Sequence, residues 1–271
     1  MAKEFLLTDD EFKQIVAMVY KACGIVLGDH KREMVYSRLA RRVRKLGFDS
    51  FSLYLDYLDS HKEEEFSHFI NSITTNLTSF FRENHHFEFL TATIIPELIQ
   101  KNQKTKRVRI WSAGCSTGEE PYSIAMTLTG LFPSNWDVKV LATDLDSNVL
   151  QKASAGEYSA SSVTGLDKSH LESFFLRSKS ADIYKVKDQL KSNIHFKRLN
   201  LLQEWPMKGP FDLIFCRNVV IYFDKPTKEN LFERYADILA PDGYLFLGHS
   251  ESMGKDQKRF KSLGKTMYRK V

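Results

Sequence analysis

The sequence predicts an α/β protein with a mostly parallel sheet, preceded by a small all-helical domain. Apolar residues follow helical spacing from Asp9 to about Ser72, and after Asn84 short apolar runs alternate with amphipathic helical stretches. This alternation is typical of a Rossmann-like sheet covered by helices on both faces. A third observation is a glycine-containing turn within residues 111–122, which joins the first predicted strand to a helix.

Length and composition indicate a soluble globular protein. The 271 residues allow one large domain or two modest ones, each able to bury a core, and 42% hydrophobic with 27% charged residues is typical of soluble globular proteins. No apolar run reaches the roughly 20 residues of a membrane helix, and the amino terminus shows no signal-peptide core. We therefore expect a cytoplasmic protein without membrane insertion. Cys23, Cys115 and Cys216 lie far apart and predict neither disulfides nor a zinc site.

The first expected domain spans residues 1–74 and contains a strongly basic helix. Turn signals at Gly24, Gly28 and Gly47 separate its helices. Beside the apolar stripe of the basic helix lies a second stripe, which we call the basic face: Lys31, Arg38, Arg41, Arg42 and Lys45. Such a face is either solvated or binds nucleic acid, anionic lipid or an acidic protein helix.

The second expected domain spans residues 75–271 and carries the alternating pattern. A helix is expected over residues 84–100. Strands are expected over residues 107–112, 138–143, 194–199, 211–216 and 244–248, and helices over 119–131, 147–155 and 225–239. From about residue 157 to 193 a short helical stretch and a hairpin pattern interrupt the alternation, which predicts a small β insertion.

The glycine-containing turn predicts a nucleotide-type cofactor site. Gly114 and Gly118 allow a sharp turn and a close approach of the backbone to a ligand, and open α/β sheets bind ligands just past such strand ends. The spacing is not that of the dinucleotide motif, and Glu119 and Glu120 follow where a diphosphate would favour amide donors. S-adenosylmethionine, with its sulfonium, ammonium and unphosphorylated ribose, fits better. The alternative is an ordinary tight turn.

Polar residues follow three further predicted strands. Asp144 ends the second strand, where its carboxylate can accept both ribose hydroxyls or cap the next helix. Asn200 and Leu201 follow the third strand, where an adenine edge would lie. Arg217 and Asn218 follow the fourth strand and are expected to line the cofactor cleft.

No metal ion is expected. His85 and His86 are neighbours on a predicted helix, where adjacent side chains point in different directions. No carboxylate or cysteine set completes a ligand group around them in the sequence.

Four ordered segments resemble the bacterial chemotaxis receptor glutamate O-methyltransferases. They are residues 74–82 (TTNLTSFFR), 116–123 (STGEEPYS), 215–224 (FCRNVVIYFD) and 248–252 (GHSES). The resemblance covers essentially the whole chain. It implies a Rossmann-like S-adenosylmethionine-dependent methyltransferase domain, with a receptor-recognition domain before it, that methylates glutamates on the cytoplasmic helices of chemoreceptors.

The resemblance also implies roles for individual residues. By position, the residues around the cofactor are Asn76, Thr78, Arg82, Glu119, Asp144, Asn200, Leu201, Arg217 and Asn218, with Glu120 a further neighbour. Family position and chemistry together assign Arg82 and Tyr222 to orientation at the methyl-transfer centre. A glutamate carboxylate with a pKa of about 4.3 is already ionised at neutral pH, so no general base is required.

Two other functions remain as alternatives. A nucleic-acid methyltransferase would share the sheet, the turn and the basic face. The segment after residue 216, however, lacks the Asn/Asp-Pro-Pro-aromatic signature of base methylation, and no nucleic-acid-binding module is recognised, so no nucleic-acid partner is expected. A non-catalytic docking module would have no need of Arg82 and Tyr222.

The β insertion bears on receptor recognition. Some members of the family bind a C-terminal receptor peptide as an extra strand of this insertion, for which glycines in the hairpin loop are favourable. Residues 177–184 contain no glycine and form a loop that looks shorter than in those members. We therefore expect the protein to recognise receptor helices mainly through the basic face, independently of such a peptide. The sequence leaves the oligomeric state open, with a monomer as the default expectation.

Overall fold

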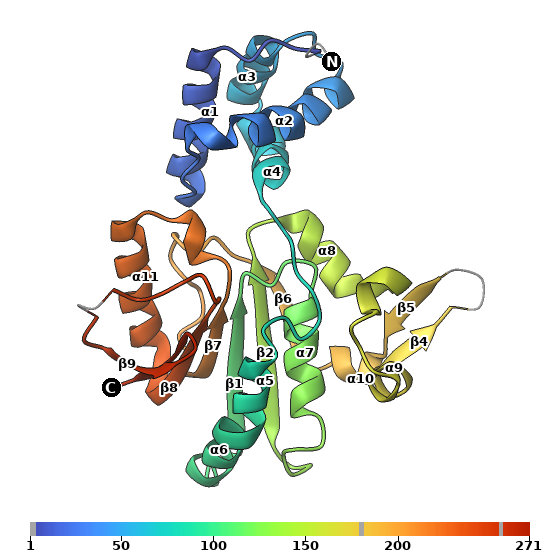
Figure 1. Ribbon diagram of the computed structural model, residues 1–271, viewed down its shortest axis with the longest axis vertical. Coiled ribbons are helices and arrows are strands. Elements are labelled where there is room, and N and C mark those ends of the chain that lie inside the picture. The colour runs from blue at the N-terminus through green and yellow to red at the C-terminus, as the bar shows by residue number, and fades with distance from the viewer. Residues whose placement is uncertain (1–3, 179–181, 255–256) are drawn as a thin grey trace. The chain divides into compact units, whose positions relative to one another are not determined.

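Two compact units make up the computed structural model, which describes residues 4–178, 182–254 and 257–271 (Figure 1). The first unit comprises Met1–Thr75 and Tyr222–Thr227, and the second comprises Asn76–Ile221 and Lys228–Val271. The division differs from the expected one because Tyr222–Thr227 belongs with the amino-terminal helices.

Two hydrogen bonds attach this short segment to the first unit. The backbone N–H of Val26 donates to the carbonyl oxygen of Tyr222 at 2.8 Å. The hydroxyl of Tyr20 donates to a carboxylate oxygen of Asp224 at 2.7 Å. The residue assigned to the methyl-transfer centre, Tyr222, is thus fixed by helix α1 and the turn that follows it.

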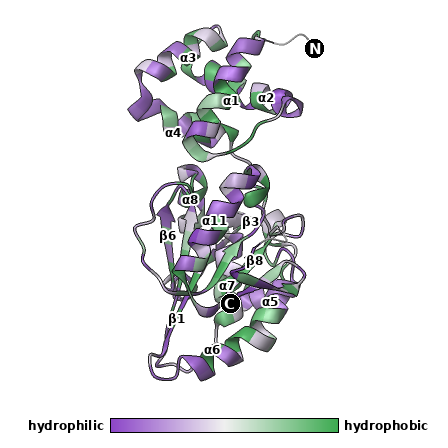
Figure 2. Ribbon diagram, turned by 90° about the vertical axis from the view of Figure 1, so that its left-hand side faces the viewer, coloured by the Kyte–Doolittle hydropathy of each residue, from purple (hydrophilic) through white to green (hydrophobic). Residues whose placement is uncertain are grey.

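The first unit is a bundle of amphipathic helices. They are α1 (Asp9–Cys23), α2 (Arg32–Leu46), α3 (Phe51–Ser60) and α4 (Lys62–Ile73). Helix α1 begins with a capping box between Thr8 and Glu11 and ends at Gly24, whose φ of 68° favours glycine. Figure 2 shows hydrophobic and hydrophilic residues alternating along these helices. The apolar side chains of all four are buried together, among them Ile15, Leu39, Tyr54 and Phe69.

Arg42 is not part of an exposed basic face, contrary to the prediction. Its guanidinium forms a bidentate pair with Glu65, in which Nε lies 2.7 Å from Oε1 and Nη2 contacts Oε2. The two side chains are 13% and 3% exposed. Because the Glu65 carboxylate is buried and needs a counter-charge, Arg42 serves the fold of the unit.

Arg38 is also used within the unit. Its Nη1 donates to the carbonyl oxygen of Thr74 at 2.9 Å and to the hydroxyl of Thr75 at 3.0 Å. Arg38 thereby satisfies backbone acceptors at the end of α4. Of the predicted basic face, Lys31, Arg41 and Lys45 are exposed.

A seven-stranded sheet organises the second unit in the order β6-β2-β1-β7-β8-β10-β9 (Figure 1). The strands are β1 (Arg107–Ala113), β2 (Asp137–Asp144), β6 (Ile194–Arg198), β7 (Phe211–Cys216), β8 (Leu239–Leu247), β9 (Phe260–Gly264) and β10 (Met267–Lys270). From β6 to β8 all neighbours are parallel, and β10 is antiparallel to β8 and β9. The strand order reverses between β1 and β7, which is where sheets of this class bind ligands.

Helices accompany the sheet as the alternating pattern predicts. They are α5 (His85–Phe89), α6 (Ile95–Lys101), α7 (Glu119–Leu128), α8 (Ser147–Ala155) and α11 (Lys225–Ile238), with a π-helical turn at Leu90–Ile94 between α5 and α6. The hairpin of β9 and β10 is absent from the predicted elements. Only Phe260 is buried in β9, so this edge strand shows no alternation that a sequence pattern could reveal.

The predicted insertion is a small antiparallel sheet with two short helices. Its strands lie in the order β3-β5-β4, with bounds Glu157–Ser159, Ile183–Val186 and Phe175–Arg177, and its helices are α9 (Lys168–Phe174) and α10 (Asp188–Lys191). Residues 179–181, on which the receptor-peptide prediction depends, lie outside the described residues. Among the described residues, no helix combines the length and apolar character needed to cross a bilayer.

The pair of Arg42 and Glu65 gives a test of the first unit. Replacing Arg42 with alanine leaves a buried carboxylate without its partner, which is expected to lower the free energy of unfolding by about 3–5 kcal/mol. Arg41 is exposed on the same helix, and Arg41→Ala should change that free energy by less than about 0.5 kcal/mol. Urea unfolding followed by circular dichroism measures both. Equal midpoints for the two variants would contradict the prediction.

Candidate active site

The turn between β1 and α7 is fixed by its backbone and by close packing. The N–H groups of Gly114 and Cys115 both donate to the carbonyl oxygen of Thr143, at 2.8 and 2.9 Å. Gly114 has a φ of 107°, and a Cβ there would lie 2.4 Å from Cγ2 of Val219. Glycine is therefore required by the backbone conformation and by the segment that follows β7.

Asp144 lies at the carboxyl end of β2, where both of its oxygens accept backbone N–H groups. Ser116 donates to Oδ2 at 2.8 Å, and Asp146 donates to Oδ1 at 3.0 Å. Helix α8 is capped by Asp146, which accepts from the N–H of Asn148 at 2.8 Å, so the capping alternative for Asp144 is wrong. Burial raises the pKa of Asp144 to about 6, although the N–H donors favour its charged form.

The segment from Asn76 to Phe81 is attached at both ends to this turn and its helix. Nδ2 of Asn76 donates to Asp146 at 2.9 Å, and the carbonyl oxygen of Asn76 accepts from the hydroxyl of Ser116 at 2.9 Å. The N–H of Phe81 donates to the hydroxyl of Ser123 on α7 at 2.9 Å. These bonds hold a stretch that is distant in sequence at the carboxyl ends of β1 and β2.

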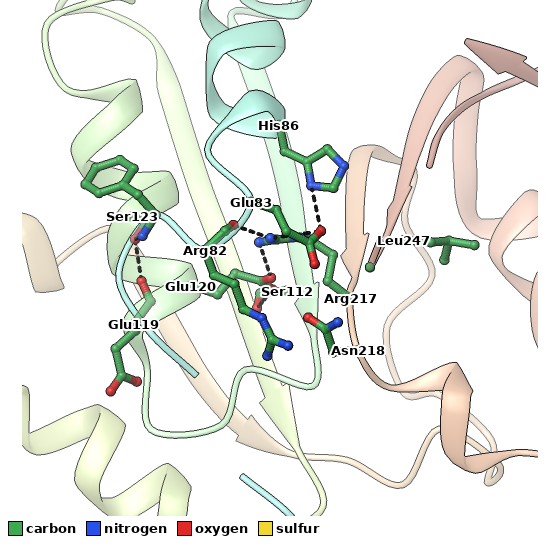
Figure 3. A network of polar contacts seen from close by, with 12 residues as sticks. Arg82, Glu83, His86, Ser112, Glu119, Glu120, Ser123, Arg217, Asn218 and Leu247 are labelled. Carbon is green, nitrogen blue, oxygen red and sulfur yellow. Dashed lines mark hydrogen bonds and ion pairs between the residues drawn. The ribbon is translucent and has the colours of Figure 1, made fainter. Parts of the chain in front are cut away.

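A buried guanidinium joins three more segments at the same end of the sheet, where the parallel strands have their carboxyl ends (Figure 3). Nη1 of Arg217, which follows β7, lies 3.1 Å from Oε2 of Glu120, and Nη2 lies 3.3 Å from Oε2 of Glu83. Nη2 also donates to the carbonyl oxygen of Arg82. Glu120 in turn accepts from the hydroxyl of Ser112 in β1 at 2.7 Å. With a side-chain exposure of 2%, Arg217 ties β7 and α7 to the turn before α5.

Burial and charge oppose each other on these carboxylates. Burial raises the pKa of Glu120 even though Arg217 lies beside it. On Glu83 burial acts in the same direction, but the hydrogen bond with His249, at 2.8 Å, and the charge of Arg217 outweigh it and lower the pKa to about 2. Glu83 is therefore ionised at neutral pH and supplies the counter-charge for Arg217.

Glu119 begins helix α7 beside the turn. Its side chain accepts from the hydroxyl of Thr117 at 2.6 Å, and the residue is 7% exposed. Burial raises the pKa of Glu119. Among the residues assigned to the cofactor, Thr78 is half-buried in the segment that follows Asn76.

Asn200 and Leu201 follow β6 and are placed beside Asp144 by the chain. The N–H of Leu199 donates to the carbonyl oxygen of Asp144 at 2.9 Å. Oδ1 of Asn200 accepts from the N–H of Leu202 at 3.0 Å, which forms a tight turn. Leu201 is 8% exposed.

Asn218 lies in a turn that a buried glutamate holds. Its φ is 58°, and its N–H donates to Oε2 of Glu251 at 2.8 Å. The N–H groups of Gly248 and Ile221 donate to the same carboxylate, at 2.6 and 3.1 Å. A Cβ on Gly248 would lie 2.4 Å from Nδ2 of Asn218, so glycine is needed there.

The structure thus gathers most of the predicted site residues at the carboxyl ends of the parallel strands. Contacts link Asn76, Arg82, Asp144, Arg217 and their neighbours there, whereas Tyr222 belongs to the other unit. Their roles as cofactor ligands and at the methyl-transfer centre stay predictions. Sequence reasoning missed Glu83, His249 and Glu251. Glu251 and His249 lie in the fourth matched segment, which was the available signal, whereas nothing in the sequence marked Glu83.

Comparison with known proteins decides the family. Residues 76–269 match the family model described as CheR methyltransferase, SAM binding domain, and residues 10–74 match CheR methyltransferase, all-alpha domain. The chain belongs to the CheR methyltransferase family. It is 43% identical to the chemotaxis protein methyltransferase of Salmonella typhimurium over 275 residues, covering 99% of this chain and 92% of that protein. The Escherichia coli protein of the same name is 44% identical over 275 residues, with coverages of 99% and 93%.

Family membership confirms the predicted resemblance, the Rossmann-like fold and S-adenosylmethionine as cofactor. This CheR-family chain is therefore a methyltransferase that uses S-adenosylmethionine. The residues at the carboxyl ends of the parallel strands fit that cofactor. Asp144 lies at the carboxyl end of β2, and a carboxylate offers about four acceptor sites, of which two accept the N–H groups of Ser116 and Asp146. Accepting positions at Asp144 therefore remain for ribose hydroxyls.

The turn can be tested with two glycines of the same unit. Gly114 and Gly130 both have positive φ, 107° and 77°, but a Cβ at Gly130 meets no atom within 4 Å. Gly130→Ala is expected to lower the free energy of unfolding by about 1 kcal/mol through backbone strain alone. Gly114→Ala should cost about 1–3 kcal/mol more because of the contact with Val219, and should weaken cofactor binding. Urea unfolding and calorimetry measure these effects, and equal losses in both variants would contradict them.

Proposed function

We propose that this enzyme transfers a methyl group from S-adenosylmethionine to glutamate side chains on the cytoplasmic helices of chemoreceptors, forming methyl esters that serve chemotactic adaptation. The supporting observation is the match over 99% of the chain to relatives named chemotaxis protein methyltransferase. Both family models are also matched, so the proposal covers the helical and the cofactor-binding parts of the chain. We accordingly place the protein in the cytoplasm, acting as a monomer.

The proposed chemistry makes modest demands on the protein. The cofactor, when bound, supplies a methyl group on a positively charged sulfur. The receptor glutamate is ionised at neutral pH, because its unperturbed pKa is about 4.3. The separated charges of carboxylate and sulfonium are solvated by water and disappear on methyl transfer, so a drier site favours the reaction. The residues of the site therefore have to align the carboxylate and exclude water.

Arg82 is the residue that we assign to the receptor carboxylate. Its backbone is fixed by Arg217, and one of its N–H groups donates to the carbonyl oxygen of Leu77 at 2.9 Å. A guanidinium has five N–H donors, so others remain for an incoming carboxylate. Tyr222 is assigned to orientation at the same centre, which rests on family position.

The cofactor is assigned to the residues that follow the parallel strands. Asp144 would accept the ribose hydroxyls, and Asn200 and Leu201 would lie beside the adenine. Asn76, Thr78, Arg82, Glu119, Arg217 and Asn218 complete the proposed set. Arg217 is so enclosed that its side chain would act by holding Arg82 and Glu120 in place.

A competition assay tests the proposed function. The protein is incubated with S-adenosylmethionine carrying a labelled methyl group, a receptor cytoplasmic fragment and tRNA. We expect label on the receptor fragment, released by mild alkali as a carboxyl ester is, and none on a control fragment whose acceptor glutamates are glutamines. Label on tRNA would favour the nucleic-acid alternative, and cofactor binding without transfer would favour the non-catalytic module.

The pH dependence of cofactor binding tests Asp144. Ribose hydroxyls donate to the carboxylate, so they bind its ionised form. Because the pKa of Asp144 is raised to about 6, affinity should fall as pH drops through that value. Between pH 7 and pH 5 the expected loss is about tenfold. Calorimetry on the wild type and on Asp144→Asn measures it. The variant should bind more weakly and lose this pH dependence, and an unchanged profile in the variant would remove Asp144 from the ribose site.

Charge reversal tests the exposed part of the basic face. Changing Lys31, Arg41 and Lys45 together to glutamate should raise the KM for receptor by at least about tenfold and leave cofactor affinity within about twofold. A triple variant at Lys21, Lys104 and Lys261, which are exposed elsewhere, carries the same charge change as control. The difference should shrink with added salt, since the screening length is about 8 Å at physiological ionic strength. Equal KM values for the two triples would contradict docking by this face.

A further inference from the structure

Two histidines and a glutamate gather beside Arg217, contrary to the expectation that no ligand group forms there. One ligand atom each from Glu83, His85 and His86 lies within 4.8 Å of the other two. Helix α5 begins only at His85, and Glu83 precedes it with a φ of 57°. The ring centroids of the two histidines are 4.2 Å apart. The reasoning from helical spacing failed because this cluster forms at a helix start and not along a helix.

A single backbone carbonyl orients both histidines. The carbonyl oxygen of Lys265 lies 3.4 Å from Nε2 of His85 and 3.2 Å from Nε2 of His86. A carbonyl only accepts, so the hydrogen bond places a proton on Nε2 and leaves the lone pair on Nδ1 in a neutral ring. Metal-binding histidines are typically held in this way, with the second ring nitrogen donating to a carbonyl or carboxylate.

Two buried acceptors in the cluster lack hydrogen-bond partners among the described residues. They are Nδ1 of His86 and Oε2 of Glu83, which lie 3.6 Å apart; the Glu83 oxygen is also ion-paired with Nη2 of Arg217 at 3.3 Å. The His86 side chain has no exposed surface, and that of Glu83 is 10% exposed. Nδ1 of His86 is therefore left unsatisfied among the described residues, which is costly, and a cation bound between it and the Glu83 carboxylate would satisfy it.

The surrounding charges allow a cation. Oε1 of Glu83 accepts from Nδ1 and the backbone N–H of His249, at 2.8 and 3.1 Å, and the His249 side chain is 65% exposed, which brings a third imidazole to the solvent side. Arg217 lies 3.3 Å from Glu83 and opposes a cation. Its charge is shared with Glu120 at 3.1 Å, so the group holds two carboxylates for one guanidinium.

We propose that Glu83, His85 and His86 form a binding site for a divalent transition-metal ion of the zinc type. Imidazole nitrogens with one carboxylate suit Zn²⁺ and Co²⁺, whereas Mg²⁺ and Ca²⁺ require oxygen ligands. The ion competes with Arg217 for Glu83. Because Arg217 also holds the carbonyl oxygen of Arg82, metal binding is expected to lower methyl transfer. The binding part of this inference is independent of the proposed receptor substrate.

Cobalt titration of the full chain tests the site directly. Co²⁺ bound by nitrogen and oxygen ligands absorbs visible light, so we expect a band that saturates at one ion per chain and is displaced by Zn²⁺. His85→Ala should weaken binding by more than about tenfold, since it removes one of three ligands. His195→Ala, an exposed histidine on β6, is the matched control and should leave the titration unchanged. Cofactor calorimetry and circular dichroism verify that each variant is folded.

The outcomes separate the site from its consequence. Absence of a saturable band, or the same titration in His85→Ala as in the wild type, would overturn the site. Glu83→Gln, which keeps the shape of the side chain and removes its charge, provides a second variant with the same expected loss. Zn²⁺ should lower methyl transfer by the wild type. In His85→Ala the Zn²⁺ concentration needed for the same inhibition should be at least about tenfold higher. Binding without any effect on methyl transfer would overturn the competition through Arg217.

Discussion

The buried guanidinium of Arg217 is the interaction on which the site depends. It lies between Glu83 and Glu120: Nη1 contacts Glu120, and Nη2 contacts both Glu83 and the carbonyl oxygen of Arg82. A lysine could not reproduce these contacts, because its ammonium lacks the planar, forked geometry of a guanidinium. Three chain segments that are distant in sequence thereby converge at the end of β7. A buried charge of this kind is tolerated only when opposite charges compensate it. The position of Arg82 is therefore coupled to the integrity of the whole network.

The second constraint is the absence of side chains at two glycines. Gly114 and Gly248 each face the segment after β7, where a Cβ would lie 2.4 Å from a side-chain atom. The same segment is held by Glu251 through three backbone N–H groups. Close backbone packing and a buried carboxylate thus fix the segment after β7 before any ligand binds. Such preorganisation suits a reaction in which the protein has mainly to align charged groups and exclude water.

Basic residues of the amino-terminal unit divide between two tasks. Arg42 and Arg38 complete the fold, the first with a buried carboxylate and the second at the end of a helix. Arg41 and Lys45 remain exposed on α2, and Lys31 remains exposed in the turn just before it. The segment Tyr222–Thr227 is bonded to α1 and its following turn, so this unit also holds a stretch from much later in the sequence. A single helical face therefore combines structural and surface charges.

The sequence alone determined the parallel strands of the sheet, the glycine turn and the cofactor, because strand periodicity, glycine positions and the polar residues after parallel strands are local signals. The resemblance to the chemotaxis methyltransferases also came from the sequence, through four segments that are each contiguous in the chain. Only the tertiary structure decided that Arg42 pairs with the buried Glu65 and that Glu83 pairs with Arg217. It also brought His85 and His86 together at Lys265. These outcomes depend on which side chains meet across 23, 134 and 179 positions of sequence, and no periodic pattern encodes such pairings.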